Sequence, residues 1–201
     1  VNHRRSSLGL GGSFLCQFAH GIAGSPLYKA GAFTVQDQGA MAVAERLAPQ
    51  PGETVLDMCA APGGKTTHLA QLMENQGIII ARDVYANRLD LVEAAAVRLG
   101  AGIVQTECGD GTADISADHN RYDKILLDAP CSGLGIIRRK PEIRYLGDKT
   151  SRKAIRQIQW ALLRRAWDYL KPGGTLVYAT CTVDPDENER QVQSLLKERE
   201  N

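Results

Sequence analysis

The sequence lacks several features that mark whole classes of protein. It has no run of about 18 apolar residues, no secretory signal, and no cysteine or histidine cluster with the spacing of a metal site. We therefore expect no membrane contact, no secretion and no bound metal. The cysteines are odd in number and scattered, which favours a reduced, cytoplasmic chain with free thiols. They are Cys16, Cys59, Cys108, Cys131 and Cys181.

An excess of one charge is also missing, since the formal net charge of the 201 residues is +1. One segment departs from this balance: between residues 138 and 156, eight basic residues stand against two acidic ones. Such a segment suits RNA phosphates held beside a cleft, but a solvated helix face has the same composition. The basic residues are Arg138, Arg139, Lys140, Arg144, Lys149, Arg152, Lys153 and Arg156, and the acidic ones Glu142 and Asp148.

The two best-known nucleotide-loop motifs are absent as well. There is no GxGxxG, and a Walker A loop would need glycine where the chain has Cys59. Residues 57–66 instead read DMCAAPGGKT, directly after an apolar strand. Gly63 and Gly64 would let the backbone approach a ligand at the start of the next helix. An ordinary strand–helix turn remains the competing interpretation of this loop alone.

Two acidic residues make a ligand at this loop more plausible. Asp83 follows the second strand, twenty positions after Gly63, where a carboxylate suits two ribose hydroxyls. Asp110 follows the third strand and would accept a hydrogen bond from an adenine amino group. Suitable groups at three successive strand ends indicate an adenosine-type ligand.

Strand and helix patterns alternate from residue 53 onward, which predicts an α/β fold with a mainly parallel sheet and helices on both faces. The apolar positions on two expected helices are Leu89, Val92, Ala96 and Leu99, and Ile155, Ile158, Leu162, Ala166 and Leu170. Asp184 is expected to cap a last helix, with Pro185 at its first position. The expected strands are 54–58, 77–81, 103–106, 122–127 and 175–179, and the helices about 38–47, 64–73, 86–99, 150–170 and 185 onward.

The first fifty residues are patterned differently from the rest. Residues 1–34 are rich in glycine and serine, and residues 1–5 suggest a flexible basic arm or the broken end of a longer protein. We divide the chain into residues 1–50, an arm and helix in possible contact with RNA, and residues 51–201, the core.

Two cysteines follow neighbouring strands of the predicted sheet. Cys131 comes shortly after Asp128 and is presented by a loop that Pro130 stiffens, and Cys181 follows the fifth strand. A single cysteine here would more often be a small core residue. Parallel sheets bind ligands at the edge where their strands end. Two cysteines at this edge favour covalent chemistry.

With these motifs, the chain resembles the Nop/Sun family of RNA cytosine-5 methyltransferases, most closely its bacterial ribosomal-RNA branch (Sun, Fmu or RsmB). The resemblance covers about residues 26–192 in order and at family spacing. It rests on DMCAAPGGKT, DAPCSG, RRKPEIRY, LKPGGTLVYATCT and PDENE, and on the segment 35–37. PGGKT alone would be weak, but the paired PC and TC motifs are specific.

The resemblance implies a Rossmann-like class I methyltransferase fold, S-adenosylmethionine as cofactor and RNA, with ribosomal RNA expected, as partner of a monomer. It implies that Cys181 is the nucleophile, that Cys131 releases the product, and that Asp128 lies between cofactor and base. Lys65 is expected to help lower the pKa of the attacking thiol. The expected cofactor residues are Cys59, Ala60, Ala61, Pro62, Gly63, Gly64, Lys65, Asp83 (ribose), Arg88, Asp110 (adenine) and Asp128.

The chain departs from the family pattern in two ways. Tyr145 stands where the family usually has tryptophan. The two strands that close the family's sheet and the helical RNA-binding domain of many ribosomal members have no counterpart in this sequence. The rival hypotheses are therefore a catalytically incomplete RNA-binding scaffold and the same reaction on transfer RNA.

Overall fold

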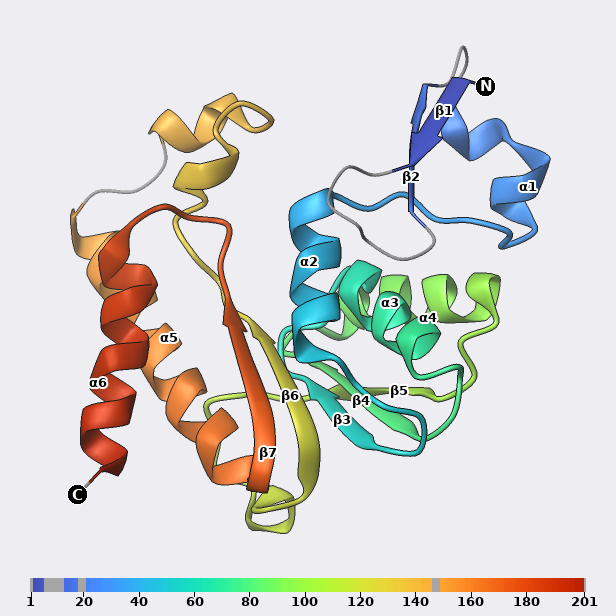
Figure 1. The fold of residues 1–201 in the computed structure, drawn as a ribbon. Coiled ribbons are helices and arrows are strands. Elements are labelled where there is room, and N and C mark those ends of the chain that lie inside the picture. Colours follow the sequence, from blue (N-terminus) through green and yellow to red (C-terminus); the bar gives the residue numbers. More distant parts are fainter. Residues whose placement is uncertain (1, 6–12, 18–20, 146–148, 201) are drawn as a thin grey trace.

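The described residues of the computed structural model are 2–5, 13–17, 21–145 and 149–200. Their centre is a parallel five-stranded sheet in the order β5-β4-β3-β6-β7 (Figure 1). This confirms the predicted α/β fold with a parallel sheet. The strands are β3 (Thr54–Asp57), β4 (Ile78–Asp83), β5 (Val104–Cys108), β6 (Tyr122–Asp128) and β7 (Leu170–Ala179).

Five longer helices cover the two faces of the sheet. Helices α2, α3 and α4 lie on one face and α5 and α6 on the other (Figure 1). Among the described residues, none of the helices is long and apolar enough to cross a membrane. The helices are α2 (Gln38–Leu47), α3 (Gly64–Leu72), α4 (Ala86–Leu99), α5 (Lys149–Tyr169) and α6 (Glu189–Arg199).

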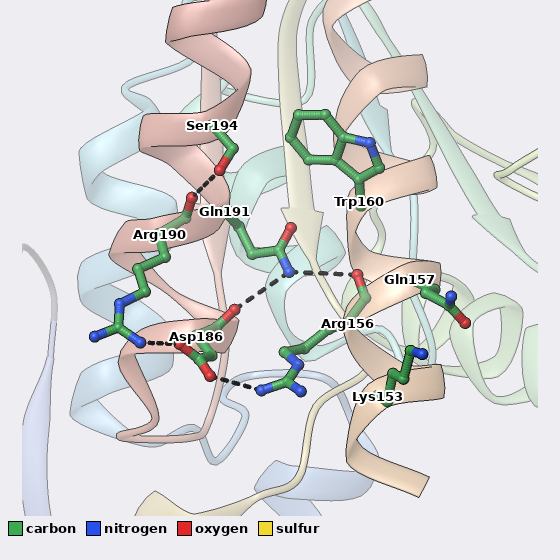
Figure 2. Close-up of a pocket in the computed structure, with 8 residues that line it drawn as sticks. All are labelled: Lys153, Arg156, Gln157, Trp160, Asp186, Arg190, Gln191 and Ser194. Atoms are coloured by element: carbon green, nitrogen blue, oxygen red, sulfur yellow. Dashed lines mark hydrogen bonds and ion pairs between the residues drawn. The ribbon is translucent and has the colours of Figure 1, made fainter. Parts of the chain in front are cut away.

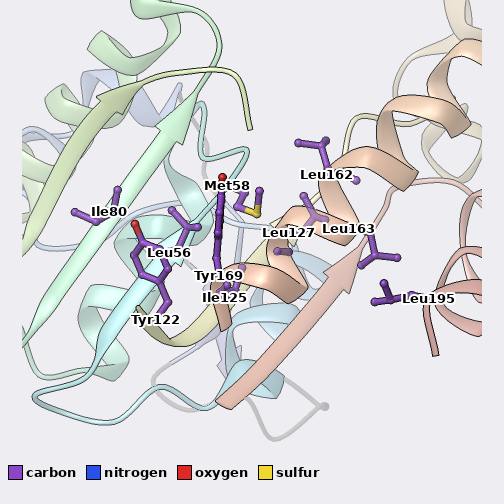
Figure 3. Packing of buried hydrophobic residues seen from close by; sticks show 12 residues of the cluster. Leu56, Met58, Ile80, Tyr122, Ile125, Leu127, Leu162, Leu163, Tyr169 and Leu195 are labelled. Carbon is purple, nitrogen blue, oxygen red and sulfur yellow. The ribbon is translucent and has the colours of Figure 1, made fainter. Parts of the chain in front are cut away.

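Alternation along the strands builds one core on each face of the sheet. Leu56 and Ile125 enter the core under α5 and α6, shown in Figure 3, whereas their chain neighbours Val55 and Leu126 enter the core under α2 and α3. Successive side chains of a strand point to opposite faces, so strands covered on both sides are apolar throughout. The order of the strands turns back between β3 and β6, and ligands of such sheets bind at that point.

The bounds of α4 and the number of core strands agree with the sequence prediction, but three details differ. Strand β7 begins at Leu170 and not at residue 175. Residues 171–174, expected to separate helix from strand, form a bulge within the strand opposite Asp123. On α5, Ile158 is 46% exposed, while the neighbouring Gln159 is buried. Asp184 caps the 3₁₀ turn η5 (Pro185–Glu187), and α6 begins later, after Asn188.

The N-terminal segment also differs from the expected flexible arm. Its described residues include two short antiparallel strands, β1 (Asn2–Arg5) and β2 (Phe14–Gln17), followed by the turn η1 (Ile22–Gly24) and the short helix α1 (Pro26–Lys29). Strands of only four residues each are too short to leave a periodic pattern in the sequence. The remaining 3₁₀ turns are η2 (Ser116–Asp118), η3 (Leu134–Ile136) and η4 (Pro141–Tyr145).

Candidate active site

The carboxyl ends of the five strands bring the predicted functional segments to one edge of the sheet. The loop 58–63 follows β3, Asp83 ends β4, Asp128 ends β6, and Cys181 follows β7. Right-handed connections between parallel strands make this convergence a consequence of the fold. A cavity of about 220 Å³ lies here. Its lining comprises Val35, Gln36, Asp37, Ala40, Asp57, Cys59, Ala60, Ala61, Pro62, Gly64, Lys65 and Asp128.

The loop after β3 is held close to its neighbours by backbone contacts. The Ala60 N–H donates to the Arg82 carbonyl at 2.9 Å, and Gly63 has φ +99°. A Cβ atom on Gly63 would lie 2.9 Å from the Cα of Val92 on α4. Gly63 therefore meets a steric requirement that no larger residue meets. Gly64 begins α3, and Gly64 and Lys65 both line the cavity.

Asp83 holds this loop and is not part of the cavity lining. Its carboxylate is 4% exposed and accepts hydrogen bonds from the N–H groups of Ala61 at 3.3 Å and Tyr85 at 3.1 Å. Arg88 lies 3.4 Å from the carboxylate and also donates to the Ala61 carbonyl at 3.0 Å. Both residues thus fix the shape of the loop.

Asp110, the predicted adenine contact, lies apart from the cavity. It is exposed, and its Oδ1 accepts from the N–H and the hydroxyl of Thr112, each at 2.8 Å. The orientation of the Asp110 carboxyl group is thus fixed by hydrogen bonds within its own loop. Of the predicted cofactor residues, the cavity lining lacks Gly63, Asp83, Arg88 and Asp110.

The segment 35–37 and the start of α2 supply lining residues to which the sequence assigned no role in cofactor binding. Gln36 Nε2 donates to the Gly64 carbonyl at 3.2 Å, which ties this segment to the start of α3. Val35, Asp37 and Ala40 line the same cavity. Their signal in the sequence was the segment 35–37, which matched a family element but carried no chemical pattern of its own.

Asp57 is a further residue that the sequence did not single out. It is buried, and it accepts a hydrogen bond from the Thr66 hydroxyl at 2.8 Å, while its Oδ1 has no partner among the described residues. Burial raises the pKa of the Asp57 carboxyl to about 7. Burial and the nearby carboxylates, Asp57 foremost among them, raise the pKa of the Cys59 thiol, so Cys59 is not a nucleophile at neutral pH.

Lys65 and Asp128 form an ion pair at the opening of the cavity. Lys65 Nζ donates to Asp128 Oδ2 at 2.6 Å, and both side chains are partly exposed. The pair links the start of α3 to the end of β6. Both residues line the cavity, and the charges of both act on the Cys181 thiol.

The two predicted catalytic cysteines are in direct contact. Their Sγ atoms lie 3.1 Å apart, and the Cys181 N–H donates to Cys131 Sγ at 3.3 Å. The hydrogen bond from the Cys131 thiol lowers the pKa of Cys181 to about 7, and Lys65 adds a smaller effect in the same direction. Donating that hydrogen bond, together with burial, raises the pKa of Cys131. Loss of a proton is therefore easier from Cys181 than from Cys131.

The basic segment is only partly free for a ligand. Arg139 forms an ion pair with Asp37, and Arg156 pairs with Asp186 at 2.6 Å. Asp148 and the side chains of Arg144 and Lys149 lie outside the described residues. Arg156 and Lys153 also border an open groove of about 520 Å³ between α5 and α6, drawn in Figure 2.

In the part of the chain that the structure describes, no group of histidine, cysteine or acidic side chains has the arrangement of a metal site. The arrangement at the sheet edge instead joins a cavity lined by three carboxyl groups, one of them in an ion pair with Lys65, and two cysteines in contact. It can attack an electron-poor carbon with sulfur and move a proton beside it.

Comparison with known proteins gives matches over most of the chain. A family described as 16S rRNA methyltransferase RsmB/F matches residues 44–201. The chain is 42% identical over 178 residues to a protein named "Probable ribosomal RNA small subunit methyltransferase B" from Bacillus subtilis (strain 168). The match covers 88% of this chain and 40% of that protein, so the chain spans about two fifths of the length of this relative.

Two solved structures from Pyrococcus horikoshii share the fold. NSun6, solved with SFG, is 37% identical with a TM-score of 0.81, and the match covers 89% of this chain and 46% of that one. A methyltransferase homolog is also 37% identical, with a TM-score of 0.84 and coverage of 98% and 61%. The similarity extends beyond the sheet to the N-terminal segment, since nearly the whole chain is covered in the second comparison.

Proposed function

The chain belongs to the RsmB/F family of 16S rRNA methyltransferases, and from this premise we propose that it methylates C5 of a cytosine in RNA, with ribosomal RNA as the substrate. S-adenosylmethionine, when bound, supplies the methyl group. The observation that carries the proposal is the contact between Cys131 and Cys181 at the edge of the cavity. Cytosine C5 is a poor nucleophile, and a thiolate bonded to C6 makes it reactive.

The cavity suits a cationic adenosyl cofactor. Asp37, Asp57 and Asp128 contribute carboxyl groups to its lining; Asp37 pairs with Arg139 and Asp128 with Lys65, and the Asp57 carboxyl, with a pKa of about 7, is free to ionise beside a bound cation. A sulfonium with an amino group gains from such surroundings. Residues 59–65 would hold the methionine and ribose portions, Asp83 and Arg88 would support the ribose end, and Asp110 would receive the adenine.

Cys181 begins the reaction because its lowered pKa makes it the more easily ionised thiol of the pair. Its sulfur forms a bond to C6 while Asp128 passes a proton from Lys65 to N3, and C5 becomes the nucleophile toward the methyl group. The base must be single-stranded or flipped out of a helix to reach these groups.

Cys131 acts in the second half of the reaction. Its pKa is raised by the hydrogen bond to Cys181, by burial and by the charge of Cys181, and the first and last of these effects end once the Cys181 sulfur is bonded to carbon. Cys131 can then lose its proton to solvent and accept the C5 proton. The C6–S bond breaks, the Cys181 thiolate leaves, and the N3 proton returns to the Asp128–Lys65 pair.

We extend the proposal to the surroundings of the site. The segment 1–50 and the unpaired cations of the basic segment would contact RNA phosphates, which position the substrate without identifying it. The proposal includes action as a monomer in the cytoplasm, where ribosomal RNA is found in bacteria.

Bisulfite sequencing of ribosomal RNA tests this function. RNA from cells with and without the gene should differ at one cytosine, and the purified chain with S-adenosylmethionine should restore the mark on the unmodified RNA. Loss of the mark on a transfer RNA instead would favour the transfer-RNA hypothesis. Binding of cofactor and RNA without any new mark would favour the scaffold.

A further inference from the structure

Glu187 is a buried acidic residue that the reaction as proposed does not use. It lies in η5, six positions after Cys181, and is 0% exposed. Its Oε2 accepts hydrogen bonds from the Ser132 N–H at 2.9 Å and from Gln159 Nε2 at 3.0 Å. Burial of a carboxyl group is costly, and both of these partners are neutral, so its presence here calls for a physical reason.

The partners of Glu187 flank Cys131 on both sides. Ser132 directly follows Cys131, and Gln159 Nε2 also donates to the carbonyl of Pro130 at 2.8 Å. The Glu187–Gln159 pair therefore holds the residue before Cys131 and the residue after it. A cysteine fixed on both sides has little freedom to move its sulfur.

The other cysteine is joined to the same group of residues. The hydroxyl groups of Ser132 and Thr182 lie 2.9 Å apart, and Thr182 directly follows Cys181. The Tyr178 hydroxyl, on the strand that leads to Cys181, donates to the Glu187 carbonyl at 2.7 Å. The loop of Cys131 and the loop of Cys181 thus meet at η5.

The turn η5 is itself anchored to α5. Asp186 pairs with Arg156 at 2.6 Å, and Gln191 Nε2 donates to the carbonyl groups of both residues at 3.2 and 3.3 Å (Figure 2). Gln159 lies on α5 less than one turn after Arg156. Glu187 is therefore held between a helix and the loops that it joins.

We propose that Glu187 is a positioning residue that, through Ser132 and Gln159, sets the distance between the sulfur atoms of Cys131 and Cys181. The geometric part concerns the free protein alone; its consequence for catalysis rests on the proposed function. Without Glu187, the partly buried Ser132 N–H loses its acceptor and Gln159 Nε2 keeps only the Pro130 carbonyl, so the Cys131 loop must shift to give the Ser132 N–H a new acceptor. The contact between the two thiols is lost with that shift.

Alkylation of Cys181 in the free protein tests the geometric part without any methyl transfer. Iodoacetamide modification of the Cys181 peptide is followed by mass spectrometry between pH 5 and 10. In the unchanged protein the rate should rise with a midpoint near 7, because the Cys131 thiol stabilises the thiolate. In Glu187→Ala the midpoint should move toward the ordinary thiol value of about 8.5, which slows alkylation at pH 7 by about tenfold.

Matched variants separate positioning from general damage. Glu189→Ala removes the same side chain from an exposed position two residues later and should leave the midpoint unchanged. Glu187→Gln retains an oxygen acceptor, so its midpoint should stay close to that of the unchanged protein. Gln159→Met keeps the length of the side chain, removes the donor, and should shift the midpoint in the same direction as Glu187→Ala. If Glu187→Ala unfolds, Gln159→Met decides the question.

A second readout connects the geometry to catalysis. With unmodified 16S rRNA transcript and S-adenosylmethionine, Glu187→Ala should accumulate a covalent protein–RNA conjugate at least several-fold over Glu189→Ala, since the displaced Cys131 no longer assists release. A general loss of stability would lower the conjugate instead. An unshifted midpoint in folded Glu187→Ala and Gln159→Met would overturn the proposal. A shifted midpoint without any methylation by the unchanged protein would contradict the proposed function and leave the positioning role supported.

Discussion

Cys131 Sγ and Cys181 Sγ lie 3.1 Å apart although the two residues are separated by 50 positions in the chain. The contact exists because β6 and β7 are parallel neighbours whose carboxyl ends meet at the same edge. The contact makes the two thiols different in the free protein: the hydrogen bond between them lowers the pKa of Cys181 and raises that of Cys131. The lowered pKa of Cys181 is thus a property of the pair.

Binding of an adenosyl ligand should stabilise the folded chain. S-adenosylhomocysteine at 100 times its Kd should add about 2.7 kcal/mol to the free energy of unfolding, whereas ATP and NAD should add little. Asp110→Ala should weaken this binding by about fivefold through the loss of one hydrogen bond, and Asp114→Ala, at another exposed aspartate, should not. Titration calorimetry measures both. Unchanged affinity in Asp110→Ala would show that Asp110 does not contact the adenine. If the unchanged protein binds no adenosyl ligand, the cofactor assignment is wrong.

Asp57 should make the folded protein less stable as the pH rises. Its folded-state pKa of about 7 lies above the value of 3.8 expected in the unfolded chain, so the native state binds the extra proton between these values. The free energy of unfolding should therefore fall from about pH 4 to pH 7, by on the order of 3 kcal/mol from this group.

Asp57→Asn should flatten this dependence and raise stability at pH 8, because an amide retains an acceptor for the Thr66 hydroxyl without the buried charge. Urea unfolding at several pH values measures the effect. Asp123→Asn serves as the control of opposite sign: the hydrogen bond and charge of Lys171 lower the pKa of Asp123, so it stabilises the fold above its ordinary pKa and loses that effect in acid. Equal slopes in Asp57→Asn and the unchanged protein would refute the assignment.

The basic segment should contribute to RNA affinity unevenly. Arg138→Ala and Lys140→Ala should each weaken binding to a 16S rRNA transcript and reduce the salt dependence by up to about one unit per lost phosphate contact. Arg139→Ala should have a smaller effect because Asp37 already neutralises this side chain. Arg164→Ala, which breaks a surface ion pair with Glu198, is the control. Filter binding at several salt concentrations measures the RNA affinity. Equal affinity and equal salt dependence in all four variants would mean that the RNA binds elsewhere.

The sequence predicted the sheet and most of its edge because these depend on local patterns. The apolar face of α4 ends at Gly100, which adopts the left-handed conformation that closes a helix, so both bounds were readable. Likewise, residues that directly follow strands had to meet at one edge, which located the cysteine pair before any contact was known.

The parts that were missed depend on contacts between distant residues. Gln36 reaches Gly64 across 28 positions from a segment without periodic pattern. Gln159 is buried and donates hydrogen bonds to Pro130 and Glu187. The helical pattern had instead predicted its neighbour Ile158 as the core residue. Such polar groups are recognisable only once their partners are placed.

The fate of the RNA in cysteine variants tests the central claim most directly. Labelled, unmodified 16S rRNA transcript is incubated with S-adenosylmethionine and each variant, and covalent conjugates are separated on a denaturing gel. Cys131→Ala should attack, transfer the methyl group and then remain attached, because the C5 proton has lost its acceptor. Cys181→Ser should give neither methylation nor conjugate, since a hydroxyl is far less acidic than a thiol, and the double variant should also give no conjugate. A conjugate with Cys181→Ser and none with Cys131→Ala would contradict this division of roles.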